Sequence, residues 1–184
     1  MKYSTAFLGK NCLNSEVELL KSQIIIDKVI NNMSLKTTYY SEGEILTRNL
    51  YKSSPFMIQN LVIKDSSIIG KPLYLIANNQ YLVFTNKEES IIYAEYIQPN
   101  NYFTSDYFSG EIKLTQSFKD FKESLDDSKY FLIFPSIHSL RNEIKSELEI
   151  KILDYSANTI SISYKHPNAK FAQDICNSIA KEYL

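Results

Sequence analysis

The hydrophobic pattern is clearest over residues 160–184. Apolar and polar residues alternate over residues 160–164, which predicts a strand. An amphipathic helix follows, and its apolar residues form two adjacent rows that together make the broad stripe of a helix facing a core. One row holds Phe171, Ile175, Ile179 and Tyr183, and the other holds Ala172, Cys176, Ala180 and Leu184.

The two ends of this helix differ in their signals. At its start we expect His166 to take the N-cap position and Pro167 to lie in the first turn, where no amide hydrogen is needed. At its end the apolar stripe continues to Leu184 without a Gly, Asn or Pro stop signal. We therefore expect a truncated helix, and a chain that is one piece of a larger protein.

A second helical pattern lies near the N-terminus. Ser15 and Glu18 stand at the spacing of a capping box, and a wide apolar face follows as far as Met33. The sequence therefore predicts a helix over residues 15–33. Residues 3–8 are predicted to form a short strand before it.

The period changes to two in the middle of the chain. Residues 37–54 are polar and rich in turn residues, so no regular element is predicted there. Short runs rich in β-branched and aromatic residues then predict an antiparallel meander over residues 56–63, 73–77, 81–85 and 91–97. Residues 100–110 are predicted to form a loop and residues 111–114 a strand. Phe118, Phe121 and Leu125 fit either a short helix or a strand edge.

The remaining pattern completes the predicted fold. A strand over residues 130–134 precedes a helix that Ser136 caps, and two strands joined by a turn follow over residues 148–153 and 159–164. This order predicts an α+β fold in which helices pack on one face of a mixed, largely antiparallel sheet with a β-meander insertion. We expect a single domain over residues 1–184, with residues 59–129 as the β-rich insertion.

Composition excludes several classes of function. The net charge is -1, with 20 basic and 21 acidic residues, so no charge surplus attracts nucleic acid. The four glycines, at positions 9, 43, 70 and 110, are too scattered for a phosphate-binding loop. No apolar run reaches the roughly 18 to 20 residues of a membrane-spanning helix. We predict neither a cofactor nor a nucleic-acid partner.

Residue types that could carry catalysis or bind a metal are few. His138 and His166 have no ligand-spaced neighbour, which argues against zinc. Cys176 lies in the apolar stripe, where packing explains it and where burial would raise the pKa of its thiol. A bridge between Cys12 and Cys176 is disfavoured, although the sequence leaves that pairing open.

Paired carboxylates and numerous aromatic residues are further candidate functional groups. The pairs Glu88-Glu89 and Asp126-Asp127 are adjacent residues in predicted turns, which do not face each other as glycosidase carboxylates do. The 14 tyrosines and 10 phenylalanines suggest sugar stacking, but strand packing explains most of them. The aromatics of residues 102–108, which we expect to be exposed, are the least explained. We predict no catalytic, cofactor-binding or metal-binding residue.

Several segments resemble one family. Residues 14–30 resemble the first helix of the Wzz-type chain-length determinant domain, which occurs in polysaccharide co-polymerases and in the membrane tyrosine kinases of capsule synthesis. Residues 3–6 look like its first strand, and residues 48–56 are similar to the element that begins the next strand in Bacteroidetes-type members. Residues 160–177 with Tyr183 resemble the strand and helix that lead into the family's long periplasmic helix. The match covers roughly residues 3–56 and 130–184.

The resemblance implies a location and a set of partners. In this family the domain lies between two membrane helices at the periplasmic face of the bacterial inner membrane, and it forms the base of a ring-like oligomer. The implied partners are other copies of the parent protein, polysaccharide, and polymerase or export proteins. Membrane contact would come only through helices absent from this chain. His166 departs from the more common Asp before the last helix's Pro, and no kinase segment with a phosphate loop is present.

Three hypotheses follow for function. The leading one is a non-catalytic periplasmic domain that regulates the chain length, polymerisation or export of capsular or extracellular polysaccharide by oligomeric scaffolding. The second is a glycan-binding module that uses the tyrosines of the meander and of residues 102–108. The third is a hydrolase with an unrecognised site, which would lose activity when Asp126 or Asp127 is neutralised.

Overall fold

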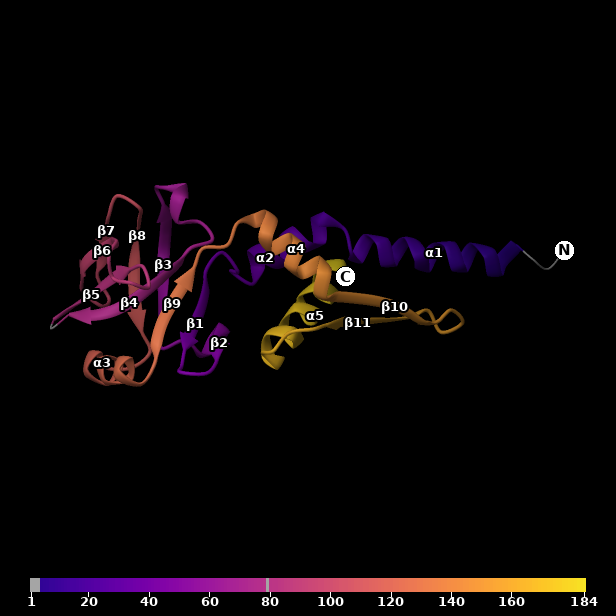
Figure 1. Ribbon diagram of the computed structural model, residues 1–184. Coiled ribbons are helices and arrows are strands. Elements are labelled where there is room, and N and C mark those ends of the chain that lie inside the picture. The colour runs from indigo at the N-terminus through magenta and orange to yellow at the C-terminus, as the bar shows by residue number, and fades with distance from the viewer. Residues whose placement is uncertain (1–3, 79) are drawn as a thin grey trace. The chain divides into compact units, whose positions relative to one another are not determined.

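The computed structural model describes residues 4–78 and 80–184, and it confirms the α+β class. The described elements belong to two compact units. One, here called the end unit, consists of Met1–Lys36 and Ile137–Leu184, and the other, the central unit, is Thr37–Ser136 (Figure 1). The central unit contains the predicted insertion of residues 59–129. It extends beyond that insertion in sequence, to Thr37 on one side and to Ser136 on the other. The single domain over residues 1–184 stays a prediction.

The end unit is built from both ends of the chain. Its strands form one antiparallel hairpin, and its helices α2 and α5 pack against each other although most of the chain separates them (Figure 1). The elements are α1 (Ser4–Leu20), α2 (Gln23–Asn32), α4 (Ile137–Glu147), β10 (Leu148–Asp154), β11 (Thr159–Tyr164) and α5 (Ala169–Tyr183). Its core combines buried side chains of α2 with the predicted stripe of α5, including Ile26, Val29 and Ile30 with Ile175 and Ile179.

The N-terminal prediction needs correction. The strand expected over residues 3–8 is wrong from residue 4 onward, because α1 already begins at Ser4, while Tyr3 lies outside the described residues. A short apolar run cannot distinguish the two structures, and extending an existing helix costs little once it is nucleated. The expected capping box at Ser15 therefore falls inside α1. A new helix begins after Ser22, whose hydroxyl accepts a hydrogen bond from the Ile25 amide at 3.4 Å.

The cap of α5 also differs from the prediction. Asn168, and not His166, is the N-cap residue, and its Oδ1 accepts a hydrogen bond from the Phe171 amide at 3.0 Å. Pro167 consequently precedes the helix and is not in its first turn. His166 instead accepts a hydrogen bond from the Asn168 amide through Nδ1 at 3.0 Å. The shorter Asn side chain reaches the third amide of the helix, as N-cap residues do.

Among its described residues, the central unit contains two antiparallel sheets and one α-helix. The larger sheet has the strand order β2-β1-β9-β4-β5-β6, and the smaller has the order β3-β8-β7. The elements are β1 (Thr38–Glu42), β2 (Thr47–Asn49), β3 (Phe56–Ile63), β4 (Pro72–Asn78), β5 (Tyr81–Thr85), β6 (Ile92–Ile97), β7 (Tyr102–Thr104), β8 (Phe108–Leu114), α3 (Phe118–Asp127) and β9 (Lys129–Ile133). With the β10–β11 hairpin, the described strands therefore form three separate sheets, where we predicted one.

The expected meander is correct only in part. Strands β4, β5 and β6 follow one another in antiparallel order, as predicted. Strand β3 does not join them, because it pairs with β8 in the smaller sheet. Strands β1 and β2 lie within residues 37–54, and β7 lies within residues 100–110, where no strand was expected. The open choice for Phe118 and its neighbours is settled by α3, which Ser117 caps.

Aromatic side chains fill the core of the central unit. Phe56, Phe84, Phe108, Phe121 and Phe134 are all completely buried. Their rings meet edge to face, for example at 5.5 Å between the centroids of Phe84 and Phe108 and at 5.4 Å between those of Phe108 and Phe134. Such edge-to-face pairs add to the free energy gained by burying the rings. The phenylalanines of this chain are therefore accounted for largely by packing.

Candidate functional site

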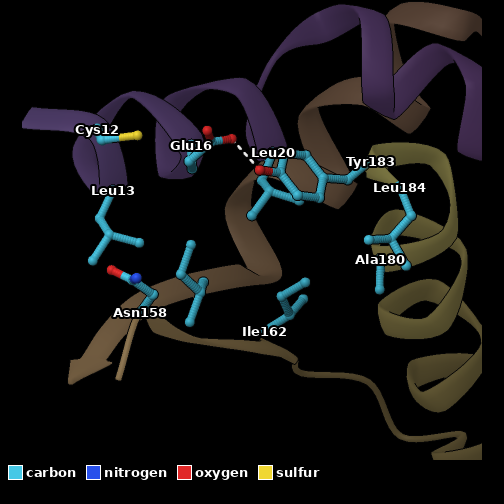
Figure 2. Close-up of a pocket in the computed structure, with 10 residues that line it drawn as sticks. Cys12, Leu13, Glu16, Leu20, Asn158, Ile162, Ala180, Tyr183 and Leu184 are labelled. Carbon is cyan, nitrogen blue, oxygen red and sulfur yellow. Dashed lines mark hydrogen bonds between the residues drawn. The ribbon is translucent and has the colours of Figure 1, made fainter. Parts of the chain in front are cut away.

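The end unit contains a groove of about 530 Å³ between α1, β11 and α5 (Figure 2). Its lining is mostly aliphatic, with four residues that carry polar or sulfur groups. The lining residues are Cys12, Leu13, Glu16, Leu20, Asn158, Ile160, Ile162, Ala180, Tyr183 and Leu184. Pockets of roughly 300 to 1,000 Å³ with apolar walls and few polar groups are typical of binding sites.

Ordinary periodicity brings these side chains to one place. Leu13 and Leu20 are seven residues apart and so lie on the same face of α1, with Glu16 between them. Ile160 and Ile162 lie on one face of β11, because strand side chains alternate between faces. The groove therefore joins one stripe from each of three elements.

One hydrogen bond crosses the groove. The Tyr183 hydroxyl of α5 donates to Oε2 of Glu16 in α1, as the dashed line in Figure 2 shows. This bond to a carboxylate raises the pKa of Tyr183, because ionised Tyr183 could not donate it. Cys12 lies at the exposed edge of the groove as a free thiol. The arrangement can bind an apolar group and place a cation or donor near Glu16.

A smaller pocket of about 230 Å³ lies in the central unit, along β4 and the turn after β5. Lys87, Lys122 and Lys129 line it together with Glu89. Lys87 also forms an ion pair with Glu42, so part of the positive charge is neutralised. The balance of charges gives this pocket no clear preference for an anion.

The structure shows the surroundings of both histidines and both cysteines. His138 is exposed on α4, as expected for a helix surface, and its Nε2 lies 3.0 Å from Nδ2 of Asn142. His166 packs against the ring of Phe171, with centroids 4.4 Å apart. Both cysteines are free thiols, and burial raises the pKa of Cys176 as predicted. No group of three or more His, Cys, Asp or Glu side chains could hold a metal among the described residues.

The candidate carboxylates and the aromatics of residues 102–108 lie in different environments. Glu88 and Glu89 are exposed in the turn after β5, where the Asn86 amide donates to Glu88 at 2.9 Å. Asp126 and Asp127 end α3, and their side chains lie outside the described part of the structure. The aromatics of residues 102–108 were expected to be exposed, which is wrong for most of them. Phe103 and Phe108 are buried in the core, while Tyr102 is 62% exposed.

The groove itself was not predicted from the sequence. Glu16 and Tyr183 lie 167 positions apart, and no local pattern announces their contact. Each belongs to a helix with a recognisable apolar stripe, which was the available signal. A stripe predicts that a helix packs on something, but it does not say which partner.

Comparison with known proteins adds no assignment. The chain matches no protein-family model, and the search of curated proteins finds no match. Among the described helices, none has an apolar stretch long enough to cross a membrane. These two comparisons therefore assign neither a family nor a function to the chain.

Proposed function

We propose that this chain is a non-catalytic periplasmic domain of an inner-membrane protein, which regulates the chain length, polymerisation or export of capsular or extracellular polysaccharide through oligomeric scaffolding. One observation carries the proposal. The resemblance to Wzz-type domains is concentrated at the two ends of the chain, over residues 3–56 and 130–184, and most of these residues fold together as the end unit, while residues 37–56 and 130–136 belong to the central unit. A family domain interrupted by a β-rich insertion would have this organisation.

Specific contacts join the two ends within the end unit. Arg141 of α4 forms a two-bond ion pair with Asp27 of α2, at 2.7 and 2.8 Å. Glu182 of α5 accepts a hydrogen bond from the Asn32 amide, at 2.5 Å. These bonds and the buried stripes of α2 and α5 make the end unit a suitable rigid base for a scaffold. In a scaffold, contacts between neighbouring copies determine the number of subunits.

The end unit also exposes apolar side chains that could make such contacts. Ile24, in the first turn of α2, is 68% exposed, and Leu19, near the end of α1, is about half exposed. Leu153 is likewise exposed near the turn of the β10–β11 hairpin. Leu19 and Ile24 are five residues apart in sequence, and they are the two exposed aliphatic side chains that we test below.

Light scattering over a concentration series tests the proposal on this chain. We expect the mass to rise to a defined multiple of 21.3 kDa. The double variant Leu19→Ser with Ile24→Ser should weaken association if this surface takes part. A monomer at every concentration, including about 1 mM, where even a weak complex forms, would contradict self-association.

A second candidate function is a glycan-binding module without enzymatic activity. The ring of Tyr96 in β6 lies 4.8 Å from that of Tyr81 in β5, between centroids. Tyr96 is 66% exposed and has φ of 56°, which is unusual for a bulky residue and often marks a functional position. Titration with purified oligosaccharide tests this alternative. Tyr96→Ser should then weaken binding strongly, whereas Tyr155→Ser, which alters an exposed tyrosine outside the meander and residues 102–108, should not.

A further inference from the structure

The hairpin formed by β1 and β2 ends in two exposed aliphatic residues. Ile45 is 94% exposed and Leu46 is 60% exposed. They lie in a four-residue turn that is closed by a hydrogen bond from the Gly43 amide to the Leu46 carbonyl, at 3.1 Å. We call these two residues the hairpin tip. Two adjacent exposed aliphatic side chains form a small apolar surface, and covering it with a partner is favourable.

The strands below the tip are well fixed. Strand β1 pairs with β2 on one side and with β9 on the other. Glu42, the last residue of β1, accepts a hydrogen bond from the Tyr74 hydroxyl at 2.8 Å and forms an ion pair with Lys87. The tip is therefore presented on an ordered support, and little conformational entropy would be lost when it binds.

The groove of the end unit has properties that suit this tip. Its volume of about 530 Å³ and its aliphatic walls can take two aliphatic side chains. Glu16 supplies negative charge on one wall, and the hairpin carries an exposed cation at Arg48, two residues after Leu46. The tip and the groove are thus complementary in their apolar surfaces, and Arg48 has the charge opposite to that of Glu16, whereas Glu44 beside the tip has the same charge as Glu16.

We propose that the hairpin tip of one copy inserts Ile45 and Leu46 into the end-unit groove of a second copy, with Arg48 approaching Glu16. The inference rests on the proposed self-association and names the surfaces that produce it. Such a contact uses two different surfaces, so it is repeated from copy to copy. Repetition of this kind yields a ring if the rotation closes and a filament if it does not.

A lipid surface is the less suitable partner for the tip. Glu42 and Glu44 precede Ile45, and the whole chain has a net charge of -1. Anionic membranes attract clusters of basic residues, which this hairpin lacks with its single Arg48. The groove of a second copy presents the single carboxylate of Glu16 and aliphatic walls, so it can pair with one Arg48 without a basic cluster.

The first experiment compares the tip with a matched surface. Light scattering is measured on the double variant Ile45→Ser with Leu46→Ser, and on Ile91→Ser with Ile92→Ser, which changes two adjacent exposed isoleucines of the same unit. We expect the tip variant to raise the dissociation constant of self-association about tenfold or more, and the control to leave it unchanged. If the wild type associates and the tip variant associates equally well, the inference is wrong while the proposed function stands. If the wild type is monomeric throughout, the inference is wrong for this chain, and the proposed function is then tested by the association of the parent protein.

The second experiment locates the contact directly. Thr47→Cys places a thiol beside the tip, and Cys12 already lies at the edge of the groove. Chains with Thr47→Cys and Cys12→Ser are mixed with wild-type chains and oxidised with copper phenanthroline. We expect a disulfide between residue 47 of one copy and Cys12 of the other, identified by mass spectrometry. Ser90→Cys, at an exposed turn, should not form this link above background.

A vesicle assay tests the other candidate partner of the hairpin tip, which is a lipid surface. Wild-type chain and the Ile45→Ser, Leu46→Ser variant are sedimented with vesicles of phosphatidylglycerol and phosphatidylethanolamine. We expect neither to bind. Sedimentation of the wild type alone would show that the tip inserts into lipid, and it would overturn the inference.

Discussion

The hydroxyl of Tyr39 in β1 accepts a hydrogen bond from the backbone N–H of Ile58 in β3, at 2.9 Å. Strand β1 belongs to the larger sheet of the central unit and β3 to the smaller one, so this bond links the two sheets. The Tyr39 ring also packs edge to face on Phe56, with centroids 5.3 Å apart. β3 is an edge strand, and Tyr39 occupies a backbone donor that could otherwise pair with another chain.

Replacing Tyr39 by Phe should destabilise the central unit. The ring would remain, but the amide of Ile58 would lose its acceptor, which costs about 1 to 3 kcal/mol when the group is buried. The measurement is urea unfolding followed by circular dichroism. Tyr40→Phe is the matched control, because the Tyr40 ring stacks on Phe131 and no hydrogen bond of its hydroxyl is observed within the described residues. Equal unfolding midpoints for the two variants would contradict the role of the bond.

The stability of the fold should fall in alkaline solution through Tyr74. Burial and the hydrogen bond to Glu42 raise the pKa of Tyr74 from 10.0 to about 12. Between these pH values the folded state keeps a proton that the unfolded state has lost, so the free energy of unfolding decreases as pH rises through this window. Stabilisation from this group is complete below pH 10.

The variant Tyr74→Phe tests this effect, since it removes the titrating group. Urea midpoints of wild type and variant are compared from pH 9 to pH 12. We expect the wild type to lose more stability than the variant over this range, although other tyrosines contribute to both curves. Parallel curves would show that Tyr74 does not titrate differently in the folded state.

Some elements could be predicted because one face of each is buried. The stripe of α5 reappears as buried Phe171, Ile175 and Ile179. The strands β4 to β6 are antiparallel neighbours as predicted. However, β5 is buried on both faces and does not alternate. Strand β1 gave no such signal, because all five of its residues are half-buried. Its polar and aromatic residues therefore show no period of two. Pairing with β9, which is distant in sequence, determines its structure.

The groove and the hairpin tip could not be predicted from local sequence patterns. The groove combines residues from position 12 to position 184, and periodicity does not say that α1 and α5 share it. Ile45 and Leu46 have the composition of core residues, yet their turn exposes them to solvent. Burial of a particular aliphatic residue depends on tertiary contacts, which the local sequence does not contain.

Gly110 in β8 permits close approach to β3, and Gly110→Ala should be destabilising. A Cβ at this position would lie 2.8 Å from Cγ2 of Ile58 and 3.0 Å from the carbonyl oxygen of Gln59. Because the second contact is with backbone, the strands would have to separate, at a cost of about 1 to 3 kcal/mol. Thermal unfolding measures the effect. Gly43→Ala is the control, since its nearest contact is 3.6 Å and no destabilisation is expected.

The ion pair between Asp27 and Arg141 should make the end unit sensitive to acid. The hydrogen bond from Arg141 lowers the pKa of Asp27 below its usual 3.8. Stabilisation is therefore present above pH 3.8 and is lost as pH falls through the lowered pKa. Arg141→Gln should flatten the acid limb of the curve of stability against pH, and Arg141→Lys should flatten it less. An unchanged limb in Arg141→Gln would show that the pair contributes nothing.

The start of α5 provides a test of which residue caps it. Asn168→Ala should cost about 1 kcal/mol, because the Phe171 amide would lose the acceptor that Asn168 provides. Asn168→Asp keeps an acceptor at the same position and should retain most of the stability. The measurement is urea unfolding at pH 7. Hydrogen exchange at the Phe171 amide supplies a local readout, since its protection should fall in the Ala variant and persist in the Asp variant. Loss of protection in both would mean that the cap depends on more than an acceptor at residue 168.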